Sequence, residues 1–222
     1  MDAIITAAGR NSRMVEDFRK LGRTPIHKLR LKIDNKAILI HTIENVLNSE
    51  IDKVTLALGH YRDELISTLE EYDMLDKVDL SINPDVDVGL SKTITNAIKS
   101  RDNYYLFMAA DQPTVTTKTI NRLITALSEA PNPSNTISVL ARRKYGWLDS
   151  AEGLGMPFCC YANLLYEYVE NEDDNLNPIL RQMISDGVEF YGIKEENELE
   201  LININHLDDY LFVKEKIEKN EL

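Results

Sequence analysis

The first 14 residues, MDAIITAAGRNSRM, constrain the fold of this chain more than any other stretch. The apolar run at residues 3–5 has β-branched character and predicts a strand that is buried on both faces. Residues 7–9 are Ala-Ala-Gly, and their small side chains allow the backbone to approach a ligand closely. Arg10 and Arg13 follow and add positive charge. The segment therefore predicts a strand followed by a loop that binds the anionic oxygens of a phosphate chain.

Spacing excludes two better-known phosphate-binding loops. Gly9 is followed by no glycine until Gly22, so the G-x-G-x-x-G pattern of dinucleotide-binding enzymes is absent, which counts against an oxidoreductase. No Gly-Lys-Ser/Thr occurs in the chain, which excludes the Walker pattern. An ordinary surface loop with two solvated arginines remains the alternative at this point.

Charge is unevenly distributed along the chain. The net charge is −12, yet the window 10–36 has nine basic and three acidic residues, a net charge of +6. The rest of the chain therefore carries −18. One basic region in an acidic protein is typical of a binding site for a small polyanion, and the net charge argues against nucleic acid as a partner. A solvated basic loop is the alternative interpretation.

The hydrophobic pattern predicts an α/β fold. Strands are expected at residues 3–5, 54–58, 78–82, 104–109, 136–141, 156–161, 189–193 and 200–203, and helices at 38–47, 61–74, 90–99, 116–128, 163–171, 178–185 and 207–219. Strands that alternate with helices favour a mostly parallel sheet covered on both faces. Residues 15–36 and 142–155 lack a regular pattern and are expected to be irregular. No linker or repeat marks a second domain, so we expect a single domain over residues 1–222.

Composition and cysteine usage indicate a cytoplasmic protein. The chain is 43% hydrophobic and 28% charged, which is typical of a globular fold. We identify no secretion signal and no apolar run of membrane-spanning length, so no membrane partner is expected. Cys159 and Cys160 are adjacent and cannot form a relaxed disulfide, so they are expected to be reduced.

Polar residues follow several of the predicted strands. Ligands bind beyond the carboxyl ends of strands in a parallel α/β sheet, so these loops are expected to converge on one site. Asp111 ends the most apolar strand and is a candidate Mg²⁺ ligand, because Mg²⁺ uses one or two carboxylates together with substrate phosphates. Two alternatives for Asp111 are a cap of the next helix and an ion pair with a lysine. The cap role is the weaker of the two, because Thr116 lies closer to the start of that helix.

An ordered set of motifs resembles the sugar-nucleotide and molybdenum-cofactor type nucleotidyltransferases, and among them the MobA-like NTP transferase family. Ala-Ala-Gly-x-x-x-Arg-Met at residues 7–14 resembles the opening motif, and Ala-Asp-Gln-Pro at 110–113 resembles the Asp-Gln-Pro or Asp-Met-Pro segment. Residues 89–91, 155–157 and 203–210 resemble the segment that faces the base, the Gly-x-Pro before a strand and the closing segment. Together these motifs cover nearly the whole chain.

The resemblance implies a three-layer α/β/α, Rossmann-like, GT-A-like nucleotidyltransferase fold with a mostly parallel central sheet. It implies an Mg²⁺-dependent enzyme that transfers a nucleotidyl group from an NTP to a phosphorylated small-molecule acceptor and releases pyrophosphate. The implied nucleotide-binding residues are Ala7, Ala8, Gly9, Arg10, Arg13, Lys28, Gly89 and Ser91. The implied catalytic residues are Arg13, Lys28 and Asp111, and the implied metal ligands are Asp111 and Asn205.

Specificity is implied less directly. Relatives with Ala at the position of Ala8 tend to use pyrimidine nucleotides, so CTP is favoured, and a molybdopterin-type acceptor comes first, as in a molybdenum cofactor cytidylyltransferase. Alternatives are a sugar-phosphate or alcohol-phosphate nucleotidyltransferase and a cobamide-type guanylyltransferase. A non-catalytic, nucleotide-binding regulatory module is a further alternative. It remains open because Asn205 is neutral and residues 173–177 depart from the family pattern.

Overall fold

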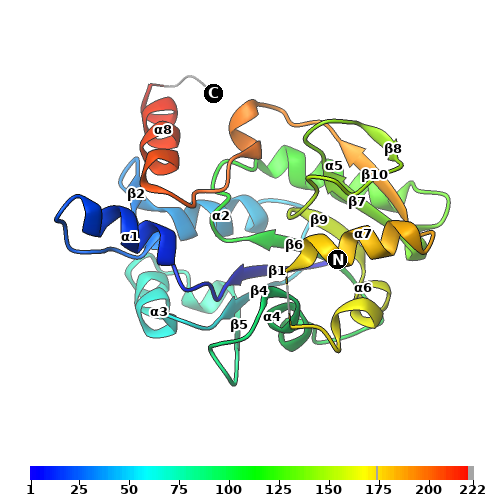
Figure 1. The fold of residues 1–222 in the computed structure, drawn as a ribbon, viewed down its shortest axis with the longest axis horizontal. Coiled ribbons are helices and arrows are strands. Elements are labelled where there is room, and N and C mark those ends of the chain that lie inside the picture. The colour runs from blue at the N-terminus through cyan, green and yellow to red at the C-terminus, as the bar shows by residue number, and fades with distance from the viewer. Residues whose placement is uncertain (174, 220–222) are drawn as a thin grey trace.

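The computed structural model describes residues 1–173 and 175–219, and within them eight strands form one sheet (Figure 1). The expected single domain over 1–222 also includes residues 174 and 220–222, which lie outside the described residues. The strands are β1 (Asp2–Ala7), β4 (Val54–Leu58), β5 (Asp79–Ile82), β6 (Tyr104–Ala109), β7 (Thr136–Leu140), β8 (Gly146–Leu148), β9 (Phe158–Tyr161) and β10 (Glu189–Ile193). Their spatial order is β5-β4-β1-β6-β9-β7-β10-β8.

The sheet is mostly parallel, as predicted. β1 pairs in parallel with both β4 and β6, β4 pairs in parallel with β5, and β7 pairs in parallel with β10. β9 is antiparallel to its neighbours β6 and β7, and the edge strand β8 is antiparallel to β10. Because β1 and β6 run in parallel at the centre, their carboxyl ends open on the same edge of the sheet.

Helices cover both faces of the sheet, which confirms the predicted three layers. The helices are α1 (Ser12–Lys20), α2 (Ile38–Leu47), α3 (Arg62–Glu71), α4 (Leu90–Ala97), α5 (Thr117–Ser128), α6 (Ala162–Val169), α7 (Leu176–Ser185) and α8 (Leu207–Glu218). Figure 1 shows α2 and α5 on one side of the central strands and α4 and α6 on the other.

Alternation along the strands places apolar side chains in both cores. In β1, Ala3 and Ile5 belong to the apolar cluster that packs on α2, α3 and α5, whereas Ile4 belongs to the cluster on α4, α6 and α7. The adjacent cysteines divide in the same way: Cys159 faces the first cluster and Cys160 the second, and both thiols are buried and free. This double-sided burial is the reason that the strands read as continuous apolar runs.

The segment 15–36, expected to be irregular, is partly regular. It begins within α1, whose Met14 and Phe18 lie four residues apart on one face and are both buried. A short 3₁₀ turn at Lys28–Arg30 and a small hairpin of β2 (Lys32–Ile33) and β3 (Lys36–Ala37) follow. The prediction was wrong because two buried side chains are enough to anchor a short helix that is otherwise charged.

Two other predictions of secondary structure differ from the structure. Residues 142–155 include strand β8. The strand expected at 200–203 is instead a 3₁₀ turn at Glu198–Leu201, because the fully buried Glu200 carboxylate turns inward. That carboxylate accepts hydrogen bonds from Thr116 N, Thr116 Oγ1, Thr119 Oγ1 and Glu196 N at 2.7–2.9 Å. The chain after this turn crosses the end of β6, where Ile204 N donates to Asp111 O at 3.0 Å.

Within residues 1–173 and 175–219, no helix is both long enough and apolar enough to cross a bilayer.

Candidate active site

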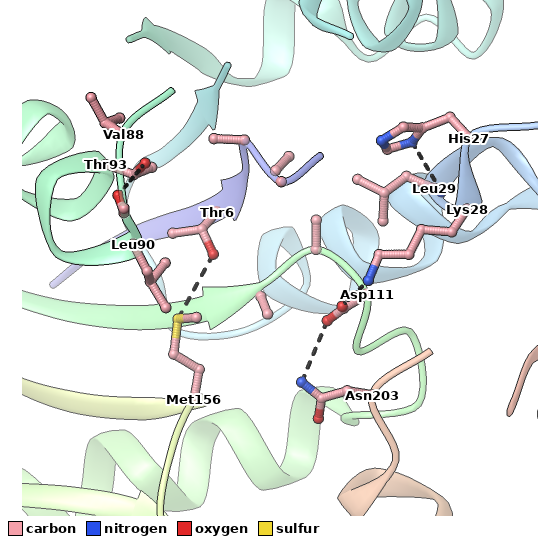
Figure 2. Close-up of a pocket in the computed structure, with 16 residues that line it drawn as sticks. Thr6, His27, Lys28, Leu29, Val88, Leu90, Thr93, Asp111, Met156 and Asn203 are labelled. Atoms are coloured by element: carbon pink, nitrogen blue, oxygen red, sulfur yellow. Dashed lines mark hydrogen bonds and ion pairs between the residues drawn. The ribbon is translucent and has the colours of Figure 1, made fainter. Parts of the chain in front are cut away.

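A cavity of about 320 Å³ lies at the carboxyl ends of β1 and β6 (Figure 2). Its walls come from residues 6–9 at the end of β1, residues 27–29, residues 88–90 at the start of α4 and residues 109–111 at the end of β6. Thr93, Met156 and Asn203 complete it. Loops that are far apart in the sequence therefore meet at the edge where ligands bind in parallel α/β sheets.

The loop after β1 is held to the Lys28 segment by Asn11. Asn11 has a left-handed backbone (φ 55°), a conformation that asparagine tolerates better than most residues. Its Oδ1 accepts from the Lys28 amide at 3.3 Å, and its Nδ2 donates to the Ile26 carbonyl at 3.4 Å. Sequence reasoning missed this residue, although an asparagine directly after a glycine-containing loop is a recognisable turn signal.

Two glycines allow the backbone segments around the cavity to come close together. A Cβ at Gly59 would lie 2.9 Å from the Ala8 side chain, so the chain after β4 packs directly on the loop after β1. A Cβ at Gly89 would lie 2.8 Å from the backbone of Asp173, and the Gly89 amide donates to the Asp173 carboxylate. Gly9, by contrast, borders open space, which leaves room above the loop for a ligand.

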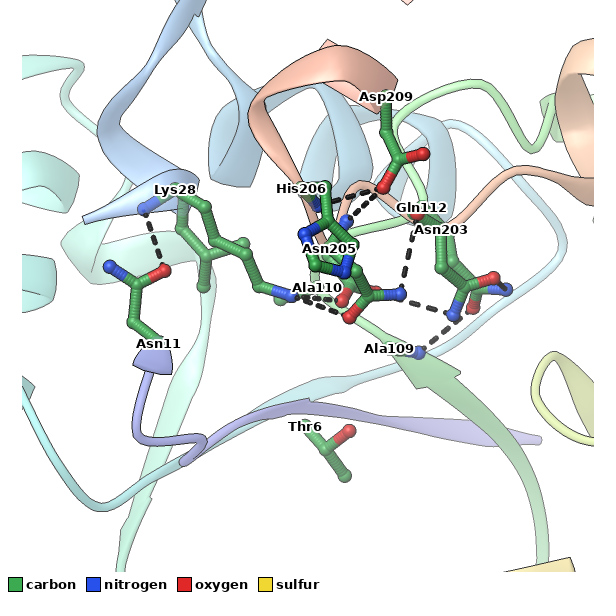
Figure 3. Close-up of polar contacts among 12 residues, drawn as sticks. Thr6, Asn11, Lys28, Ala109, Ala110, Gln112, Asn203, Asn205, His206 and Asp209 are labelled. Atoms are coloured by element: carbon green, nitrogen blue, oxygen red, sulfur yellow. Dashed lines mark hydrogen bonds and ion pairs between the residues drawn. The ribbon is translucent and has the colours of Figure 1, made fainter. Parts of the chain in front are cut away.

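The centre of the site is a lysine whose ammonium group donates hydrogen bonds to two side-chain oxygens. Lys28 Nζ lies 2.5 Å from Asp111 Oδ2 and 3.3 Å from Asn205 Oδ1, and the Lys28 and Asp111 side chains are only 17% and 13% exposed (Figure 3). Asn205 Nδ2 donates to the Asn203 carbonyl at 3.4 Å, so the amide oxygen must face the ammonium group. An asparagine therefore presents one oxygen here, as a carboxylate would.

The side-chain oxygens in this arrangement are suitable ligands for a hard divalent cation. Oxygens of Asp111 and Asn205 already converge on one cationic group, the Lys28 ammonium, and oxygen is the ligand that Mg²⁺ and Mn²⁺ prefer. Within the described residues no group of three His, Cys, Asp or Glu side chains is placed to hold a metal. A cation bound by Asp111 and Asn205 would therefore take its further ligands from water and substrate phosphates.

A second cavity of about 610 Å³ adjoins the first and shares Leu90, Met156 and Asn203 with it. Arg13, Arg142 and His206 line it. The structure thus places Arg13 in the second cavity, apart from the loop amides with which the sequence grouped it. Arg10 points outward, 68% exposed, and pairs with Asp87 at 3.0 Å.

The remaining residues implied by the resemblance are divided between the cavity and the protein interior. Ala7, Ala8, Gly9, Lys28 and Gly89 line the first cavity. Ser91 does not line it: the residue is fully buried and its hydroxyl donates to the Glu172 carbonyl at 2.9 Å. Thr93, two residues further along α4, lines the cavity instead, and its hydroxyl oxygen accepts from Asn83 Nδ2 at 2.9 Å. In the segment 173–177, residue 174 lies outside the described residues, and residues 176–177 line the second cavity.

His27 lines the first cavity, although the sequence analysis did not single it out. It is 5% exposed, and its Nδ1 accepts from the Leu29 amide at 3.3 Å. Burial lowers the pKa of His27 from 6.5 to about 4, and the nearby charges of Lys28 and Arg30 add to the effect. The ring is therefore neutral at neutral pH and packs against Tyr61, with 4.7 Å between ring centroids.

Comparison with known proteins assigns this chain to the nucleotidyltransferase class. A nucleotidyl transferase from Methanothermobacter is 36% identical, with a TM-score of 0.88 over 99% of this chain and 98% of that chain. The chain belongs to the MobA-like NTP transferase family, since the model of that domain matches residues 3–186.

Two further relatives are more distant. The bifunctional protein GlmU of Acetivibrio thermocellus is 26% identical over 213 residues, which cover 94% of this chain and 42% of that protein. The chain thus spans about two fifths of that relative's length. Rv0371c from Mycobacterium tuberculosis, solved in complex with manganese, has a TM-score of 0.66 at 18% identity, with 96% of this chain and 97% of that chain covered. At that identity it supports the fold alone.

Proposed function

We propose that this protein is an Mg²⁺-dependent nucleotidyltransferase that transfers a nucleoside monophosphate from an NTP, with CTP favoured, to a phosphorylated small-molecule acceptor. The observation that carries the proposal is the convergence of Lys28, Asp111 and Asn205 beside the phosphate-binding loop. An ammonium group, a carboxylate and an amide oxygen at the mouth of a cavity match the needs of a triphosphate and a divalent cation. Membership of the MobA-like family supports the same reaction class.

The chemistry follows from charge neutralisation and positioning. The acceptor phosphate must attack an α-phosphorus that is already surrounded by negative oxygens. The amides of Ala8 and Gly9 and the Lys28 ammonium would bind the triphosphate, and Asp111 and Asn205 would hold Mg²⁺. When bound, Mg²⁺ neutralises phosphate charge and stabilises the leaving pyrophosphate. The residues of this chain then act by orientation and electrostatics, without a covalent intermediate on the protein.

The second cavity is the proposed site of the acceptor. Arg13 and Arg142 provide permanent positive charge for a phosphate group, and the shared residues Met156 and Asn203 make this cavity continuous with the nucleotide cavity. A phosphate held there lies next to the nucleotide. A molybdopterin-type acceptor is proposed first and a sugar or alcohol phosphate second; guanylyl transfer to a cobamide-type acceptor is the third candidate.

Pyrophosphate release from each standard NTP, measured with Mg²⁺ and a panel of acceptor phosphates, tests the proposal. We expect release with CTP and one acceptor class, and none without acceptor. Faster release with GTP would overturn the pyrimidine preference alone. Binding of nucleotides, seen as a rise in melting temperature, without release for any acceptor would favour a non-catalytic nucleotide-binding module instead.

A further inference from the structure

Gln112 is a fully buried amide next to Asp111 in the sequence, and Figure 3 shows its hydrogen bonds with Ala109 and Asn203. The Ala109 amide donates to Gln112 Oε1 at 3.1 Å. Gln112 Nε2 donates to the Met156 carbonyl at 2.8 Å and to Asn203 Oδ1 at 3.2 Å. One side chain therefore connects the end of β6, the start of β9 and the C-terminal crossing segment.

Two backbone groups determine the direction of these hydrogen bonds. The Ala109 N–H can only donate, so Gln112 must turn its oxygen toward it. The Met156 carbonyl can only accept, so the Gln112 amide nitrogen must lie on the other side. The orientation of Gln112 is thus set by groups that no side-chain rotation can change.

Gln112 transmits this orientation to Asn203. The Gln112 nitrogen and Arg142 Nη2, both donors, meet Asn203 Oδ1, each at 3.2 Å. The oxygen of Asn203 is therefore held on that side, and its Nδ2 faces Asp111 Oδ1 at 3.5 Å (Figure 2). Asp111 Oδ2 remains with Lys28. If the Asn203 amide were reversed, two oxygens would face each other at Asp111.

We propose that Gln112 is a positioning residue that acts through Asn203 to hold the Asp111 carboxylate in the rotation that binds a divalent cation. The inference rests on the proposed function, because it concerns the same metal site. Gln112 itself does not line the cavity, and its side chain bonds to Ala109, Met156 and Asn203 rather than to the oxygens of Asp111. It contributes by keeping Asn203 a donor toward Asp111, so that Asp111 is oriented before the metal arrives.

A double-mutant cycle on metal binding tests the relay. Gln112→Met conserves volume but cannot donate, and Asn203→Ala removes the contact with Asp111. The measured quantity is the affinity for Mn²⁺ in the presence of CTP, followed by the electron paramagnetic resonance signal of free Mn²⁺. Each single variant should weaken Mn²⁺ binding by roughly tenfold, the effect typical of the groups that orient metal ligands. The double variant should be no more than about twofold weaker than the weaker single variant.

A matched control distinguishes the relay from a structural role. Asn45 Nδ2 donates to the carbonyls of Pro113 and Val115 at 3.0 and 2.9 Å, so it supports the same loop without reaching Asn203. Asn45→Leu should lower the melting temperature and leave the Mn²⁺ affinity within about twofold of wild type. Multiplicative losses in the double variant, or an equal loss of affinity in Asn45→Leu, would overturn the relay.

Two further measurements keep the inference open to refutation. If Gln112→Met does not fold, hydrogen exchange of the Gln112 side-chain amide in wild type serves instead: it should be slow, and fast exchange would contradict the hydrogen bonds from which the relay is built. Absence of Mn²⁺ binding in wild type would overturn the proposed function and the relay together. Mn²⁺ binding in wild type, with losses of affinity that multiply in the double variant, would overturn the relay alone.

Discussion

Replacing Lys28 by methionine should destabilise the metal-free protein and make it respond to Mg²⁺ alone. In the structure the Lys28 ammonium occupies the position between Asp111 and Asn205 that a cation would take. Lys28→Met keeps most of the unbranched side chain but leaves the Asp111 carboxylate, 13% exposed, without its ion-pair partner. The same change leaves the two oxygens available to a metal ion.

The magnitude follows from the geometry of the ion pair. At 2.5 Å and an effective dielectric constant of about 20, the attraction between the charges is about 7 kcal/mol before desolvation is counted. Removing one partner of a buried pair costs about 3 kcal/mol, because the remaining charge stays poorly solvated. For a chain of 222 residues this corresponds to a melting temperature roughly 10 °C lower. Mg²⁺ at about 100 times its dissociation constant should restore about 2.7 kcal/mol.

Thermal unfolding with a chelator and with millimolar Mg²⁺, both without nucleotide, measures the effect. Lys32→Met is the matched control, because Lys32 pairs with Glu71 at the surface and is 52% exposed. We expect the control to behave as wild type, with little response to Mg²⁺ alone. A Lys28→Met protein as stable as wild type in the chelator, or an equal Mg²⁺ response in all three proteins, would refute this reasoning.

Three further perturbations probe the site and the fold. Asp111→Asn should lower turnover on the order of 10²-fold while NTP affinity changes by no more than about tenfold, because the lost charge counts most in the transition state. Pyrophosphate release measures the turnover, and a nucleotide titration measures the affinity. A fully active variant would remove Asp111 from the proposed metal site. The low pKa of His27, about 4 in the folded protein against 6.5 ordinarily, means that below pH 6.5 the unfolded chain binds a proton that the folded chain does not. Between neutral pH and about pH 4, the free energy of unfolding should therefore fall by roughly 3 kcal/mol more in wild type than in His27→Gln. Urea unfolding at the two pH values measures this difference. Equal losses in both proteins would contradict the prediction. Glu200→Gln should cost about 2 kcal/mol in denaturant unfolding, because an NH₂ group would face donors that now bond a buried carboxylate; an unchanged midpoint would argue against that network.

Local sequence patterns were sufficient for the strands of the central sheet except the short edge strand β8. Strands such as β1, β4 and β6 are short, apolar and bounded by turn residues, so their places along the chain were predictable. Thr116 was expected nearer to its helix start than Asp111, and it is indeed the N-cap of α5, accepting from the Thr119 amide. Short elements anchored by one or two side chains, such as α1 and the turn at Glu198–Leu201, were missed because their partners are remote in sequence.

Sequence by itself determined the fold class and the family, and it predicted that the loops after β1 and β6 would meet. Parallel strands end on one edge, and this rule alone brings the loop after β1 toward Asp111. Only the tertiary structure decided that Arg13 lines the second cavity, that Ser91 is buried away from the first, and that Gln112 bonds to Asn203. The physical reason is that hydrogen-bond direction and cavity lining depend on groups brought together from positions some 40 to 90 residues apart, and no local pattern records which of them will meet.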